Sequence, residues 1–163
     1  MAELTNLESK LGEVLGLAMA AQGATEKVKK LPELEDDLAD VLDRMHQEAA
    51  ATEERGTELA STFEGKKTAI LDEAREVKQK ATEMMQDYLD RASDALDGFE
   101  FLTMAEAGEV GHWEILQTLN ERARIAGVDE LVEWALPIQR RHFEDARAGS
   151  LKLASQEDPN ETA

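Results

Sequence analysis

The chain contains no cysteine and few prolines or aromatic residues. Its 163 residues include three prolines, two tryptophans, one tyrosine and four phenylalanines. Without cysteine, the protein has no disulfides, no thiolate metal site and no thiol nucleophile. The prolines are far apart, so they leave long stretches in which a helix can run without interruption.

Basic residues and long apolar runs are also scarce. Lysine and arginine number 18 against 36 acidic residues, for a formal net charge of -18. Such a surface repels nucleic-acid phosphates and anionic lipids. The longest apolar run, from Val14 to Ala21, is too short to span a bilayer, and no basic signal-peptide segment begins the chain. We therefore expect a cytoplasmic protein that binds neither nucleic acid nor membrane.

The acidic excess itself has three interpretations. A well-solvated surface that keeps the protein soluble is the simplest. Adaptation to a salt-rich host and attraction of cations are the other two. Each of the three is consistent with the composition.

The residues that are abundant favour helix. Alanine, leucine, glutamate and lysine dominate, a mixture that suits helices better than sheets. Apolar residues recur at alternating intervals of three and four, which places them on one face of a helix. In the first such segment they are Leu4, Leu7, Leu11, Val14, Ala18 and Ala21. We predict an all-α fold.

Capping residues and breakers predict where the first helices begin. Thr5 and Glu8 have the spacing of a capping box, so the first helix should start at Thr5. Pro32 suits the first turn of a second helix. Ser61 and Glu64 repeat the capping-box spacing and predict the start of a third.

The stretch 64–126 has two interpretations. Gly98 interrupts it, at a cost of about 1 kcal/mol relative to alanine in a helix. The apolar seam nevertheless continues in phase beyond that glycine. One kinked helix and two separate helices are both consistent with this pattern. The capping-box spacing of Thr103 and Glu106 favours a restart at that point.

The last helix is expected after Gly127, which suits the C′ position of the preceding one. It should begin at Val128 and be kinked at Pro137. No internal repeat or linker divides the chain. We predict one domain over residues 1–154, followed by a flexible acidic tail over residues 155–163.

Glu109 and His112 are the first candidates for a chemical site. Their E-x-x-H spacing puts a carboxylate and an imidazole on one helix face, about one turn apart. Dinuclear metal bundles use two such pairs and two further glutamates. The alternative is a surface glutamate beside a partly buried histidine. Glu106 shares the apolar seam with Glu109, and two buried carboxylates need a cation, an arginine or a proton.

Three further residues extend the candidate metal site. Glu48 continues the apolar stripe of the second helix, so it faces the interior or its rim. Glu114 lies beside small residues that either permit close approach of another helix or leave room for a ligand. His142 follows Gln139 by three residues on the last apolar stripe, and it is either a ligand or a core-edge histidine bonded to an acid. The predicted metal ligands are Glu48, Glu109, His112, Glu114 and His142.

Three short segments resemble a known family. His112-Trp113-Glu114-Ile115 resembles the H-Y-E-I signature of the stress-induced YciF-like branch of ferritin-like proteins. Met45-His46-Gln47-Glu48-Ala49 resembles the H-x-x-E-T of its second helix, and residues 66–74 resemble its short connecting helix. The similarity extends over residues 4–154. It implies a ferritin-like four-helix bundle of long up-and-down antiparallel helices with an additional connecting helix, often dimeric, with a dinuclear iron site in some members.

Several positions depart from the family pattern. The inward glutamate of the family's first helix has no match here. Met45 stands at the histidine of its second helix, and Gly111 stands at the acid before its signature. The acidic pair of its last helix falls near Gln139 and His142. The resemblance therefore implies a reduced or modified site for iron, manganese or zinc.

Three functions are consistent with these patterns. The first is a ferritin-like bundle with a reduced metal site and a stress- or metal-related role. The second is a metal-free bundle that acts through assembly or partner binding. The third is an active diiron oxidase or ferroxidase. The resemblance implies a homodimer, and no nucleophile or phosphate-binding loop indicates another kind of enzyme.

Overall fold

Five α-helices and no strands form the part of the chain that the computed structural model describes, residues 2–163. The all-α prediction is confirmed. The helices are α1 (Asn6–Lys29), α2 (Asp36–Ala60), α3 (Lys67–Tyr88), α4 (Ala95–Ala123) and α5 (Ala126–Ala154).

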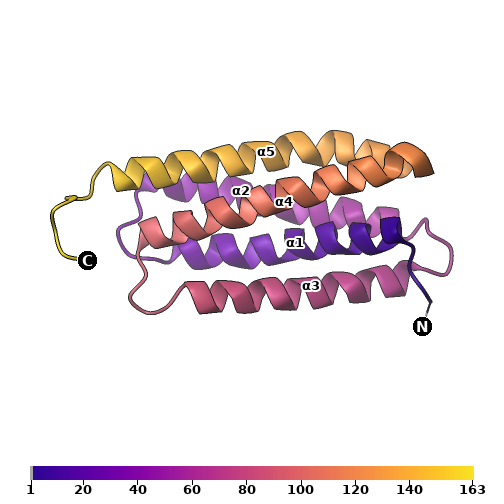
Figure 1. Ribbon diagram of the computed structural model, residues 1–163, viewed down its shortest axis with the longest axis horizontal. Helices are drawn as coiled ribbons and strands as arrows, with labels where there is room; N and C mark the ends of the chain where they lie inside the picture. Colours follow the sequence, from indigo (N-terminus) through magenta and orange to yellow (C-terminus); the bar gives the residue numbers. More distant parts are fainter. Residues whose placement is uncertain (1) are drawn as a thin grey trace.

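The helices run up and down, with their connections at alternate ends (Figure 1). α1 and α2 form one antiparallel hairpin, and α4 and α5 form another. α3, which follows the first hairpin in the chain, runs the length of the molecule at its outer edge and packs mainly on α1. α2 and α4 therefore point in the same direction. The result is a helical bundle of α1, α2, α4 and α5 with α3 along its side.

Two apolar clusters fill the two ends of the bundle. One cluster contains Leu11, Trp113 and Leu136, and the other contains Leu42 and Phe99. Polar side chains occupy the level between the clusters on α2, α4 and α5. We call this level the polar layer, and its members are Glu48, Glu106, Glu109, Gln139 and His142.

The predicted start of the first helix is confirmed. The Thr5 hydroxyl accepts the backbone N–H of Glu8 at 3.2 Å, and the Glu8 carboxylate accepts the backbone N–H of Thr5 at 2.8 Å. The predicted start at Ser61 is wrong. α2 continues to Ala60, a turn with Gly65 at φ 72° follows, and α3 begins only at Lys67 without a side-chain cap.

The stretch 64–126 forms two helices, but the predicted break at Thr103 is wrong. The break spans residues 89–94, and Asp94 caps α4. Its carboxylate accepts the backbone N–H of Asp97 at 3.0 Å, and the Asp97 carboxylate accepts that of Asp94 at 2.9 Å. Gly98 lies inside α4, where a Cβ would come within 2.8 Å of Val28. Close contact between α4 and α1, and not a helix end, therefore explains this glycine.

The predicted role of Gly127 is also wrong, since that residue lies inside α5. α4 ends at Ala123, and Arg124 adopts the left-handed conformation with φ 55°. The Asn120 side chain closes this turn. Its amide donates to the Ile125 carbonyl at 3.0 Å and to Asp129 at 2.7 Å, and its oxygen accepts the Ile125 N–H at 3.0 Å.

α5 continues through Pro137 as a single helix to Ala154. Residues 155–163 lie outside the helices and are exposed, and the Gln156 amide donates to Glu35 at 2.8 Å. The flexibility of this segment stays a prediction. Within residues 2–163, every helix is too short or too polar to cross a bilayer.

α1 and α3 approach each other closely through glycine. A Cβ at Gly16 would lie 2.3 Å from the Ala74 carbonyl oxygen and 2.9 Å from the Val77 Cβ. A backbone atom cannot move aside as a flexible side chain can. Gly16 therefore determines how near α3 lies to α1.

Replacing Gly16 with alanine should lower the free energy of unfolding by roughly 1–3 kcal/mol, because the methyl group forces the two backbones apart. Urea denaturation measures this change. Gly23→Ala, in the same helix, is the control, since a Cβ there meets nothing within 4 Å. That variant should be more stable than the wild type by up to about 1 kcal/mol. Equal effects of the two substitutions would contradict the close packing of α1 and α3.

Candidate functional site

His142 lies at the centre of the polar layer. Its side chain is 3% exposed, its Nε2 lies 3.4 Å from a Glu48 oxygen and its Nδ1 lies 3.9 Å from a Glu106 oxygen. The two ring nitrogens point in different directions, so the imidazole separates the two carboxylates. A neutral imidazole donates from one nitrogen only, whereas the imidazolium donates from both. His142 thereby joins α2, α4 and α5.

Glu48 is the outer acid of the layer. Arg141 forms an ion pair with its carboxylate, and the Nε of Arg44 lies 3.7 Å away. Partial burial acts to raise the pKa of Glu48, but the hydrogen bond from Arg141 and the nearby His142 outweigh it and lower that pKa. Glu48 is therefore ionised and already neutralised by arginine.

Glu106 and Glu109 are the inner acids, on successive turns of α4. They are only 1% and 5% exposed. The Gln139 amide donates a hydrogen bond to the Glu106 carboxylate. Burial raises the pKa of both groups, and for Glu109 the adjacent Glu106 raises the pKa further, well above its ordinary value. The pair therefore keeps a proton to higher pH than exposed glutamates do.

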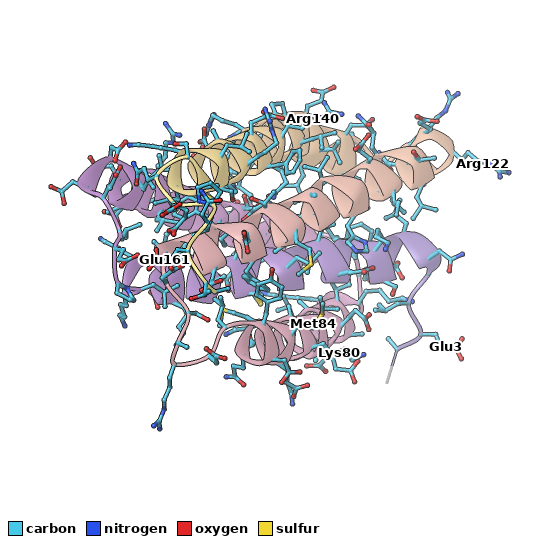
Figure 2. The ribbon with its side chains drawn as sticks, turned by 60° about the vertical axis from the view of Figure 1, so that its left-hand side comes forward. Glu3, Lys80, Met84, Arg122, Arg140 and Glu161 are labelled. Atoms are coloured by element: carbon cyan, nitrogen blue, oxygen red, sulfur yellow. The ribbon has the colours of Figure 1, made fainter. Side chains whose placement is uncertain are left out.

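The other two predicted ligands lie outside the polar layer. The Nδ1 of His112 lies 3.2 Å from a Glu13 oxygen and 3.1 Å from the Lys10 Nζ, at a half-buried position facing α1. Glu114 is exposed and lies 3.8 Å from Arg140, whose side chain is on the outer surface of α5 (Figure 2). The buried stripe of α4 runs through Glu106, Glu109 and Trp113, which leaves positions 112 and 114 to either side of it.

The structure therefore brings the predicted residues together only in part. Glu48 and His142 are in direct contact, and Glu109 joins them through Glu106. The prediction omitted Glu106 and Gln139 from the ligand set, although both share a three-four seam with a chosen residue. That spacing, Glu106 with Glu109 and Gln139 with His142, is the signal that could have identified them.

A separate acidic cluster lies at one end of the bundle. Carboxylate oxygens of Glu33, Asp94 and Glu157 lie within 4.8 Å of one another, the one such group of three potential metal-binding side chains within residues 2–163. Asp94 already caps α4, and the other two residues are exposed. Exposed acids in such groups are common without an ion, so we assign this cluster no function.

Comparisons with protein-family models, with curated proteins and with solved structures find no match. The ferritin-like resemblance and its metal chemistry stay predictions. Any functional proposal for this chain must therefore be argued from the geometry of the polar layer and its surroundings.

The raised pKa of Glu109 predicts how stability depends on pH. The folded protein holds this proton more tightly than the unfolded chain, whose glutamate titrates near 4.5. The stabilisation from the protonated group is therefore complete below about pH 4.5 and is lost as the pH rises toward the folded-state pKa. The free energy of unfolding falls over that window by up to about 1.4 kcal/mol per pH unit from this group.

Glu109→Gln removes this contribution. Relative to the wild type, the variant should become progressively more stable as the pH rises above about 4.5, because an amide cannot ionise. Urea denaturation at a series of pH values measures the difference between the two proteins. Glu100→Gln makes the same charge change on the exposed side of α4 and should show no such trend. Parallel curves for wild type and Glu109→Gln would refute the assignment.

Proposed function

We propose that this protein is a ferritin-like helical bundle that binds one divalent transition-metal ion in its polar layer, through Glu106, Glu109 and His142. The observation that carries the proposal is the burial of two carboxyl groups on successive turns of α4. Their one ion-pair partner within residues 2–163 is His142, 3.9 Å from Glu106. Buried carboxylates without sufficient positive charge are strongly destabilising, so a cation or a proton must compensate them.

The donor types suit a transition metal. Carboxylate oxygen and imidazole nitrogen together bind iron, manganese and zinc. His142 presents Nδ1 toward Glu106 and Nε2 toward Glu48, so Glu48 would orient the imidazole from behind while Nδ1 binds the ion. The donor atoms of Glu106, Glu109 and His142 are not all within 4.8 Å of one another. Binding therefore requires these side chains to rotate and the carboxyl pair to lose its proton.

The chain topology supports the ferritin-like part of the proposal. In the ferritin-like arrangement, one connection that runs the length of the bundle joins two antiparallel hairpins. In this chain, α3 provides that connection. α1, however, faces the level of the polar layer with Ala18 and Ala21 in place of an acid. We therefore propose a single ion with a metal- or stress-related role, and we do not favour a dinuclear ferroxidase.

A metal-free bundle that works through assembly or partner binding is the second candidate. Every fully buried polar side-chain atom within residues 2–163 already has a hydrogen-bond partner. Large apolar side chains are also exposed, Met84 and Met104 among them. A proton shared by Glu106 and Glu109 would complete the layer in this case. The homodimer expected from the resemblance belongs to this candidate as well as to the first.

Thermal unfolding of chelator-treated protein with Zn(II), Mn(II) or anaerobic Fe(II) tests the metal proposal. An ion that binds only the folded protein stabilises it by about 2.7 kcal/mol at 100 times its dissociation constant. No rise in melting temperature with any ion would leave the metal-free bundle. If Fe(II) binds, its oxidation under air would reveal a ferroxidase.

Two histidine variants distinguish the possible ligand sets. His142→Gln should weaken metal binding at least about tenfold, as expected for loss of a ligand, while His112→Ala should leave the affinity unchanged. Calorimetric titration measures both, and circular dichroism checks that each variant is folded. The opposite result would favour the ligand set predicted from the sequence, in which His112 binds the ion.

A further inference from the structure

A groove of about 240 Å³ lies between α3 and α4, with α1 as its base. Its walls are almost entirely apolar, with alanines of α1 and α3 and the side chains of Leu17, Met85 and Phe101. The exposed methionines Met84 on α3 (Figure 2) and Met104 on α4 lie at its sides. Flexible, polarisable methionines adapt to ligands of different shapes.

Two features of α4 indicate that this groove is a binding site. Glu106 and Glu109 line it, so two acidic residues that are more than nine-tenths buried lie beside an apolar space. Gly108 also lines it, and a Cβ there would meet nothing within 4 Å. Packing within the chain does not require this glycine, which costs about 1 kcal/mol relative to alanine in a helix. Its missing side chain keeps the groove open.

The charges around the groove favour a cation. Within residues 2–163, no lysine, arginine or histidine forms an ion pair with Glu109, whereas Glu48 has two arginines. The parts of α1 and α3 that line the groove contribute no charged side chain. Around Glu109, the titratable groups are Glu106 on α4, His142 behind it on α5 and His112 at the edge of the groove. Lys10 and Glu13 of α1 bind that last histidine.

We propose that this groove binds a small primary amine, with its ammonium group on the Glu109 carboxylate and its hydrocarbon body between α3 and α4. The volume is below the roughly 300–1,000 Å³ of pockets for drug-sized molecules, so the ligand is a short chain or a single ring. The apolar walls bury the hydrocarbon. The ammonium supplies the positive charge that Glu109 lacks.

Binding is non-covalent, because the ammonium group donates charge-assisted hydrogen bonds to the Glu109 carboxylate. The Glu106 carboxylate already accepts a hydrogen bond from the Gln139 amide. This inference goes beyond the metal proposal and needs no metal, so it is tested in the presence of a chelator.

Calorimetric titration of the full chain with three six-carbon probes tests the proposal. Hexylamine should bind at least about tenfold more tightly than hexan-1-ol, because a charge-assisted hydrogen bond contributes more than a neutral one. Hexanoate should bind most weakly, since its carboxylate adds a negative charge beside Glu106 and Glu109.

Matched variants connect the preference to Glu109. Glu109→Gln should remove most of the difference between hexylamine and hexan-1-ol, and Glu100→Gln, with the same charge change away from the groove, should keep it. Gly108→Leu has room for its side chain, since a Cβ there meets nothing within 4 Å, and that side chain should block the groove and abolish binding of both probes. Circular dichroism confirms that each variant is folded.

Three outcomes would overturn the proposal. Equal affinity for hexylamine and hexan-1-ol would show a merely apolar groove, and absence of binding by both would show a closed one. Sedimentation that reveals a dimer dissociated by Gly108→Leu, without amine binding to the wild type, would show that a second copy of the chain fills the groove. Metal binding is measured in separate experiments without amine, so the results can contradict either proposal and still support the other.

Discussion

His142, held between Glu48 and Glu106, connects α2, α4 and α5 at the middle of the bundle. Apolar clusters above and below it supply most of the hydrophobic stabilisation, but apolar contacts still form when one helix is displaced along another. Polar contacts at this depth do not tolerate such a displacement, because it would leave charged groups buried without partners. The polar layer is therefore the constraint that relates α5 to its two neighbours, whether a proton or a metal ion balances its charge.

The acids of the layer differ according to their surroundings. Glu48, near the surface, is neutralised by Arg141 and has a lowered pKa, whereas Glu109 has no ion-pair partner within residues 2–163 and burial raises its pKa. The surroundings of two similar residues thus shift their pKa values in opposite directions. Both proposals for this chain place a cation beside Glu109, a buried acid that lines the groove between α3 and α4.

Much of the architecture follows from local sequence, and the errors have physical causes. Thr5 and Glu8 predicted a helix start because a capping box needs only residues three apart. The same spacing misled at Ser61 and Thr103, since a hydroxyl inside a helix can bond its own backbone, as Thr103 does to the Phe99 carbonyl at 2.7 Å. The true start of α4 has the same reciprocal cap, made by Asp94 and Asp97, and the Asn120 side chain closes the end of that helix. In the candidate site, periodicity correctly placed Glu106 and Glu109 on the seam. Whether His112 turns toward them or toward Glu13 depends on the position of α1, which spacing alone does not determine.

α3 is anchored unevenly along its length. Its buried residues, Ala69, Ile70 and Ala74, all lie in its first half, while the second half rests on partly exposed contacts and on Tyr88, whose ring centroid is 5.5 Å from that of Phe101. A segment with so little buried surface opens at a lower free-energy cost than the whole protein unfolds. Local fraying of this half of α3 would widen the space next to α4 without disturbing the bundle core, because the buried contacts of α3 lie in its other half.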